Sequence, residues 1–216
     1  MQAIVGSNVK VEIESGLVVE SPPINITALT AANPGVATAS GHGLSNGDVI
    51  KFAVTEGMVQ LDGQAVRVSG VSGANFTLEN LDTSDYDAWT TGSVDLIDTF
   101  VTYAASTSIS MPNPAPLKLD STTLQDKTKH YVFGMPDAPD GSATALFNPG
   151  GSAEEIIKAA TRTNSSLAIR ITFASGQKRI FNAFVSGGSG FTMGSNQVAT
   201  SQIAFTPLAE VVDYVV

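Results

Sequence analysis

The sequence predicts a mainly β fold: a β-dominated α+β protein of antiparallel strands with one flanking α-helix. Apolar and polar residues alternate over short runs, as in residues 8–14, where Val9, Val11 and Ile13 alternate with Lys10 and glutamates. The chain contains 20 Gly and 10 Pro, and turn-type residues separate these runs. Only residues 153–162 show the pattern of an amphipathic helix. We therefore expect an antiparallel β-sandwich or barrel.

The amino-acid composition argues against several classes of protein. The 216 residues are 43% hydrophobic, which is enough to build a core and excludes a disordered acidic chain. Only 14% are charged, against roughly 25% in ordinary globular chains, and this argues against a helix bundle. The net charge of −9 argues against a binder of duplex DNA. The absence of cysteine excludes disulfides, thiolate zinc sites and a cysteine nucleophile.

Residues 24–97 predict a small all-β module inserted into a larger domain of residues 1–23 and 98–216. Turn signals separate six short strand-like runs, at residues 24–30, 36–40, 48–54, 65–71, 75–81 and 92–97. Residues 23–98 contain two basic and nine acidic residues, a net charge of −7, so most of the acidity belongs to this module. We expect a small barrel or sandwich here.

The larger domain has the remaining strands, two long loops and the helix. We expect strands at residues 8–14, 17–20, 100–109, 128–133, 167–173, 179–185, 197–206 and 210–216. Residues 111–116 carry prolines at every second position, which a central strand cannot accommodate, so they predict an exposed arm. Residues 134–151 predict a second loop.

Two features of the sequence predict the helix: a capping residue at its N-terminus and an apolar face along its length. Ser152 is expected as the N-cap, with Glu155 three residues later completing a capping box. Ile156 and Ile157 begin the apolar stripe, and Arg162 lies near the negative end of the helix dipole.

No constellation of residues predicts catalysis. His42 and His130 lie far apart in sequence without ligand-type spacing. The acidic run at residues 82–87 lacks the central Gly and distant Glu of an EF-hand. The glycine run at residues 187–190 lacks the Lys-Ser/Thr of a phosphate loop. We expect no enzyme activity, no cofactor and no metal. No run approaches the roughly 20 apolar residues of a membrane span, and we expect neither a signal peptide nor membrane insertion.

The module resembles a small β domain of phage structural proteins that is similar to a β domain of ubiquitin-activating enzymes. This resemblance implies decoration or binding, without ubiquitin chemistry. The matching residues are 26–30, 41–52, 57–58, 61–63, 66–68, 76–78 and 81–86.

The flanking parts resemble the tail tube, or major tail, proteins of long-tailed bacteriophages. The resemblance rests on the order of elements: an N-terminal strand pair, the helix at 152–162, the hairpin at 168–185 and the closing run at 198–207, with Phe181-Asn-Ala-Phe-Val185 and Ala204-Phe-Thr-Pro207. It implies a fold of tail-tube type and homohexameric rings that stack into a hollow conduit. It also implies assembly in the host cytoplasm, a place in the virion, and tape measure, tail tip and terminator proteins as partners. DNA would pass through the lumen without specific binding.

Within that resemblance, two sets of residues are candidates for contacts. The proline-rich arm and the 134–151 loop are expected between rings; the arm residues are Met111, Pro112, Asn113, Pro114 and Pro116. Glu12, Glu14 and Asp213 are candidates for lumen charge, because an acidic lumen repels phosphate. The alternative function is a receptor- or carbohydrate-binding β protein of a tail fibre or tip, with Tyr86, Trp89 and Tyr103 stacking on sugar rings.

Overall fold

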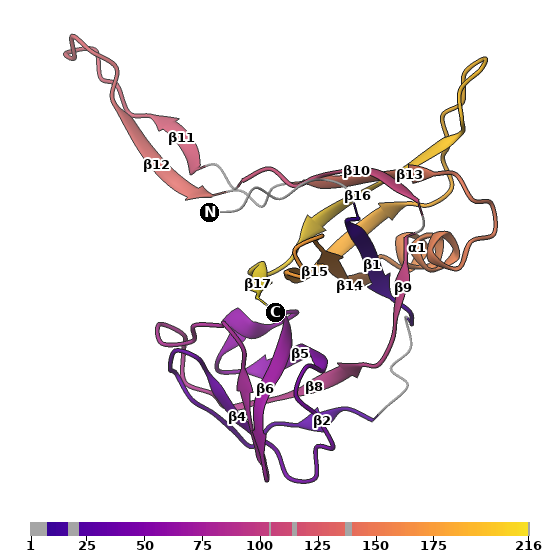
Figure 1. The fold of residues 1–216 in the computed structure, drawn as a ribbon. Helices are drawn as coiled ribbons and strands as arrows, with labels where there is room; N and C mark the ends of the chain where they lie inside the picture. The colour runs from indigo at the N-terminus through magenta and orange to yellow at the C-terminus, as the bar shows by residue number, and fades with distance from the viewer. Residues whose placement is uncertain (1–7, 17–21, 104, 114–115, 137–139, 216) are drawn as a thin grey trace.

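The predicted mainly β fold with one α-helix is confirmed by a computed structural model (Figure 1). The structure describes residues 8–16, 22–103, 105–113, 116–136 and 140–215. The strand expected at residues 17–20 lies outside the described residues. No helix in the described part is long and apolar enough to cross a membrane.

The larger of the two main sheets is antiparallel and has the order β10-β13-β16-β15-β14-β1-β9, with β17 paired to β15. Its strands are β1 (Lys10–Glu14), β9 (Phe100–Thr102), β10 (Ser106–Ser110), β13 (Gly141–Leu146), β14 (Ser166–Thr172), β15 (Lys178–Gly187), β16 (Thr200–Pro207) and β17 (Val212–Tyr214). Segments from both ends of the chain therefore build one sheet.

This sheet curls into a barrel. Strands β9 and β10 stand at opposite ends of the strand order, yet only residues 103–105 separate them. Because a residue spans at most about 3.5 Å, the two edges must approach each other. The single strand expected at residues 100–109 is therefore wrong: Ala105, at φ 51°, interrupts it. On one side Tyr103 N–H donates to Val11 O, and on the other Leu146 N–H donates to Ala105 O.

The barrel interior is filled by alternating residues of its strands. Helix α1 (Ser152–Thr163) lies against β15 and contributes Ala153, Ile157 and Ala160 to the same core. The strands contribute Val11, Ile13, Tyr103, Ala143, Ala145, Leu167, Ile169, Ile171, Phe181, Ala183, Val185, Ile203 and Phe205. The period-two alternation read from the sequence thus points one face of each strand inward.

The predicted capping box is wrong. Gly151 is the N-cap, Ser152 is the first helical residue, and no side chain caps the helix. A Cβ at Gly151 would meet the carboxylate of the buried Glu154, so a larger residue there would require this side chain to move. Glu155 instead pairs with Lys158 at 2.9 Å.

The second main sheet comprises residues 24–97 and has the order β2-β8-β5-β6-β7-β4-β3. Its strands are β2 (Ile24–Asn25), β3 (Ala28–Leu29), β4 (Val36–Thr38), β5 (Val49–Glu56), β6 (Ala65–Ser72), β7 (Asn75–Leu78) and β8 (Thr91–Ile97), with a 3-10 turn η1 (Val59–Leu61). Ile26 N–H donates to Gly92 O and Thr27 N–H to Thr38 O. Residues 26 and 27, between β2 and β3, therefore connect β8 on one side with β4 on the other, and this sheet closes as well.

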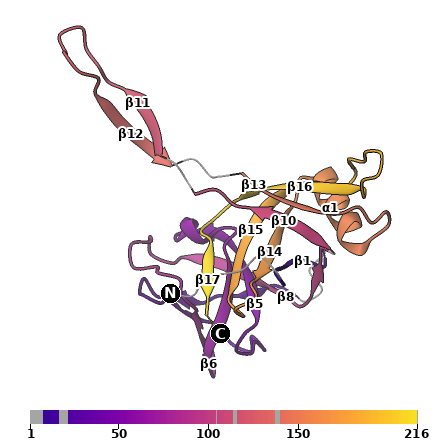
Figure 2. The same cartoon turned by 45° about the horizontal axis from the view of Figure 1, so that its top comes forward.

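A two-stranded hairpin projects from the body. Strands β11 (Pro116–Asp120) and β12 (Tyr131–Pro136) extend the edge pair β10–β13 outward (Figures 1 and 2). The strand expected at 128–133 begins later, at Tyr131. The loop expected at 134–151 is wrong in part, because β13 occupies its middle and pairs with β10 and β16.

Candidate assembly surfaces

The barrel and the module share one hydrophobic core. Ala168, Ile180, Val212 and Tyr214 project from the outer face of the barrel sheet into the apolar cluster of the module. The Arg67 backbone N–H donates to Tyr214 Oη at 2.9 Å, and the Arg67 guanidinium lies 4.7 Å from the centre of the Tyr214 ring. Burial raises the pKa of the Tyr214 phenol. The module therefore covers this face of the barrel.

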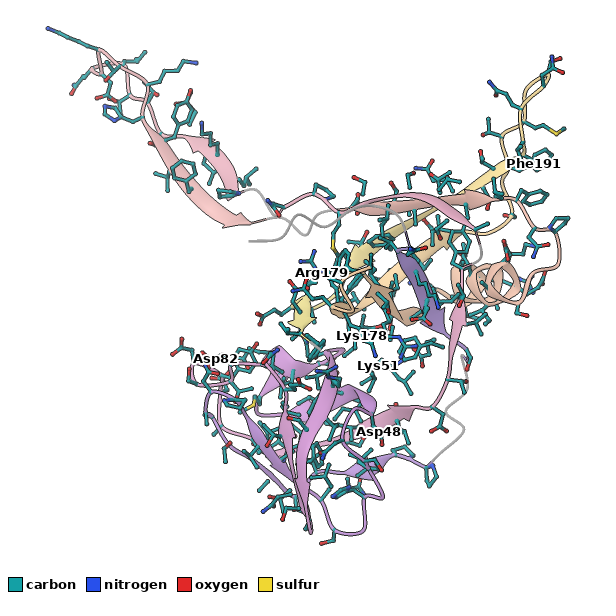
Figure 3. All side chains as sticks on the ribbon, in the orientation of Figure 1. Asp48, Lys51, Asp82, Lys178, Arg179 and Phe191 are labelled. Carbon is teal, nitrogen blue, oxygen red and sulfur yellow. The ribbon has the colours of Figure 1, made fainter. Side chains whose placement is uncertain are left out.

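Ion pairs surround that shared core. Lys51 of the module pairs with Glu14 of β1 at 3.2 Å, and Glu14 also accepts a hydrogen bond from the Ala168 N–H. Arg179 donates to both carboxylate oxygens of Asp213, at 2.6 and 2.7 Å. Lys51 and Arg179 both lie in the region where barrel and module approach each other (Figure 3).

Glu12 is held by Arg170 at 2.8 Å. Burial opposes ionisation of Glu12, but the hydrogen bond and positive charge of Arg170 outweigh it, so the pKa of Glu12 is lowered from 4.5. The Arg170 guanidinium also lies 4.1 Å from the centre of the Phe100 ring. All three lumen candidates, Glu12, Glu14 and Asp213, are thus paired with cations within the subunit.

The predicted arm is the base of the hairpin. Met111 packs against the barrel core, and its Sδ lies 3.6 Å from an Arg179 guanidinium nitrogen. Pro112 and Asn113 are exposed. Pro116 begins β11 and pairs with Pro136. Pro114 lies outside the described residues.

The hairpin presents an aliphatic face without a partner in the described structure. Pairing places Leu119 opposite Val132, so both share one face, and Leu117 lies two residues along the same strand. The exposed fractions of Leu117, Leu119 and Val132 are 58, 50 and 56%. Lys118, Asp120, Tyr131 and Phe133 occupy the opposite face. Sequence patterns did not predict this surface, because β11 follows directly on a proline-rich segment. The alternation of Leu117 and Leu119 with polar residues was the one signal available.

A second exposed apolar patch lies at the other end of β13. Phe191, Met193 and Val198, in the β15–β16 connection, are 56, 65 and 70% exposed. Phe191 stacks on Phe147 with ring centres 4.9 Å apart, and it projects from the body (Figure 3). It also lines a hollow of about 290 Å³ with Thr144 and Gln202. We call Phe147, Phe191 and Met193 the Phe191 patch.

The titratable residues considered from sequence do not converge. His42 contacts Gly73 O and the Leu44 N–H through its two ring nitrogens, which is a role in a turn. His130 lies in the hairpin, near Asp126. Hydrogen bonds from Ser84 lower the pKa of Asp82. In the part of the chain that the structure describes, no three His, Asp or Glu residues are grouped to hold a metal ion.

The three aromatic residues of the alternative function do not form one platform. Tyr103 is buried in the barrel core and bonds to Ser201. Trp89 packs edge-on to Phe52, and its indole N–H donates to Ile26 O. Tyr86 lies beside Glu210; burial and this carboxylate raise the pKa of its phenol. A sugar-binding surface built from all three is therefore not favoured.

The described residues thus form a barrel, a module that covers one face of it, and a hairpin with an exposed apolar face. The chain belongs to the phage tail tube protein (TTP) family, whose model matches residues 56–214. No curated protein matches the chain. The protein is thus a structural component of the phage tail tube, and the virion tail is its place. The match begins in β5, so it includes most of the module and does not separate the module from the barrel.

Proposed function

We propose that six copies of this subunit close into a ring and that rings stack into a hollow conduit for DNA delivery. Family membership supports the tube, and the observation that carries the stacking is the hairpin of residues 116–136, whose aliphatic face no other described residue covers. A contact between two different surfaces of identical subunits closes into rings or continues as a filament, and a tube requires both. Tape measure, tail tip and terminator proteins would bind at the ends or in the lumen.

We propose a separate role for the barrel, for the arm with its hairpin, and for the module. The barrel, residues 1–23 and 98–216, forms the tube wall, and the arm at Met111, Pro112, Asn113, Pro114 and Pro116 positions the hairpin between rings. The module of residues 24–97 is a small β-barrel similar to the phage domain described above. Its core is continuous with the outer face of the barrel sheet, so we propose that it stiffens each subunit besides decorating it.

DNA would pass this tube without a specific contact. The chain contains 11 basic and 20 acidic residues, so it lacks the excess of cations that grips phosphate. Glu12, Glu14 and Asp213 stay candidates for the lumen on the condition that the edge of the barrel face that carries the module is turned toward it. Because each is paired with Lys51, Arg170 or Arg179, they would give a nearly neutral surface, and a weaker repulsion than free carboxylates.

Negative-stain microscopy of the concentrated protein tests this function. We expect hollow tubes or six-fold rings, assembled without another tail protein. Deletion of residues 112–116 shortens the arm and displaces the hairpin; it should leave a soluble, folded subunit that forms no tubes. Normal tubes from the deletion variant would contradict the role of the arm, and compact trimers of the intact chain would contradict the tube.

A further inference from the structure

The two exposed apolar surfaces lie at opposite ends of one strand. Strand β13 begins where the hairpin ends and finishes at Leu146, next to the Phe191 patch. The hairpin and the β15–β16 connection project in different directions in both views (Figures 1 and 2). Within one subunit the barrel stands between them, so the two surfaces cannot cover each other.

The hairpin needs a partner to be stable. An isolated two-stranded hairpin is marginally stable at best in water. Leu117, Leu119 and Val132 are 50–58% exposed in the subunit, so a partner that covers them would bury further apolar area. Covering this aliphatic face therefore orders the hairpin and stabilises a contact at the same time.

We propose that the aliphatic face of the hairpin of one copy docks on the Phe191 patch of the next copy. The inference rests on the proposed tube function and names the two surfaces that meet. Because the surfaces differ and lie at opposite ends of the subunit, each copy keeps one free hairpin and one free patch. The contact therefore repeats from copy to copy without closing after two.

Charge supports this pairing. Residues 180–209, which include Phe191, Met193 and Val198, contain no charged residue. Lys118 and Asp120 lie on the face of the hairpin opposite to Leu119. Docking the aliphatic face therefore buries no ion, whereas burying an unpaired ion would oppose association. The charged face, with Tyr131 and Phe133, stays outward.

A competing site exists on the module. The hairpin contains three lysines and two aspartates, whereas the module is strongly acidic, so opposite charges could attract them. The module also has a hollow of about 340 Å³ lined by Met58 and Trp89, next to the exposed Val59. The lysines that would be attracted are Lys127 and Lys129 in the β11–β12 connection and Lys118 on the face opposite to Leu119. Such a contact would leave the aliphatic face uncovered, which is why we favour the Phe191 patch.

The absence of cysteine makes a direct test possible. The double variant Leu119→Cys/Met193→Cys is assembled at high concentration, treated with a short bismaleimide and run on a denaturing gel. We expect a ladder of trimers and larger species, because each copy is linked to two neighbours. Each single variant should give dimers at most. The control Leu119→Cys/Val59→Cys places the second thiol on the module and should give no ladder.

Electron microscopy of the same samples tests the docking contact and the tube function separately. Tubes without a ladder from the Met193 pair would overturn the docking and leave the tube function standing. A ladder from the Val59 pair in its place would assign the hairpin to the module of the next copy and overturn the Phe191 contact. If the unmodified protein is folded by circular dichroism but forms no tubes, and the double variant gives no ladder, both the tube function and the docking are contradicted.

Discussion

The module and the hairpin are both β structures that leave the path of the barrel, but they bury their apolar residues in opposite ways. The module closes on itself, and its core is continuous with the barrel through Tyr214. Among the described residues no second layer covers the hairpin, and Leu117, Leu119 and Val132 are about half exposed. We infer that the module contributes to the stability of the single subunit, whereas the hairpin contributes to stability only after subunits associate.

The largest expected effect on the subunit comes from Tyr214, where module and barrel meet. We expect Tyr214→Ala to lower the free energy of unfolding by about 3–5 kcal/mol, the usual loss when a buried aromatic ring is removed. Tyr214→Phe keeps the ring but leaves the Arg67 N–H without its acceptor, so it should lose about 1–3 kcal/mol. Urea unfolding measures both. Equal, small losses would show that the module folds independently of the barrel.

The next effect tests the inner face of the barrel. Ile157 of α1 is fully buried, whereas the neighbouring Ile156 is partly exposed. We expect Ile157→Ala to lose about 2–5 kcal/mol and Ile156→Ala clearly less. The same unfolding experiment measures both, and similar losses would contradict the placement of Ile157 inside the barrel.

A smaller effect is expected from Glu12, and it depends on pH. The pKa of Glu12 is lowered in the fold, so its contribution is complete above the unfolded value of 4.5 and is lost as pH falls through the folded value. We expect Glu12→Gln to lose about 1 kcal/mol at pH 7. The difference from the unmodified protein should shrink as pH falls below 4.5.

The control for this pH dependence is Glu155→Gln. Glu155 forms an exposed pair with Lys158 on α1, and such pairs contribute little to stability. Its unfolding curve should follow that of the unmodified protein between pH 7 and 3. A constant deficit of Glu12→Gln over this range would argue against the ion pair with Arg170.

The smallest effect on subunit stability, and the sharpest on assembly, is expected in the hairpin. Leu119→Ser and Lys118→Ser introduce the same residue at adjacent positions on opposite faces. Both should change the free energy of unfolding by no more than about 0.5 kcal/mol, as exposed substitutions do. Leu119→Ser should abolish or strongly reduce tube formation, and Lys118→Ser should leave it unchanged. Light scattering during assembly distinguishes them; equal behaviour would contradict a docking role for the aliphatic face.

Local patterns predicted much of the secondary structure. Alternation predicted β1, β14 and β15, because each has one face toward a core and the other toward solvent or the module. The same rule missed β13, whose inward residues are Gly141, Ala143 and Ala145. At position 141 a side chain would clash with the Phe205 ring, which packs against the Gly141 backbone. Small residues carry little hydrophobic signal, so only their neighbours show that they form a strand.

The sequence by itself determined the fold class, the strand-rich segment at 24–97 and the family, since all of these depend on residue type and order along the chain. The tertiary structure decided which ends of the chain meet. In the tertiary structure residues 100–109 form strands at two opposite edges of the sheet, and Lys51 forms an ion pair with Glu14. The hairpin and the Phe191 patch stay exposed at opposite ends of the subunit. Exposure and pairing are properties of segments distant in sequence, so no local pattern of residues could specify them.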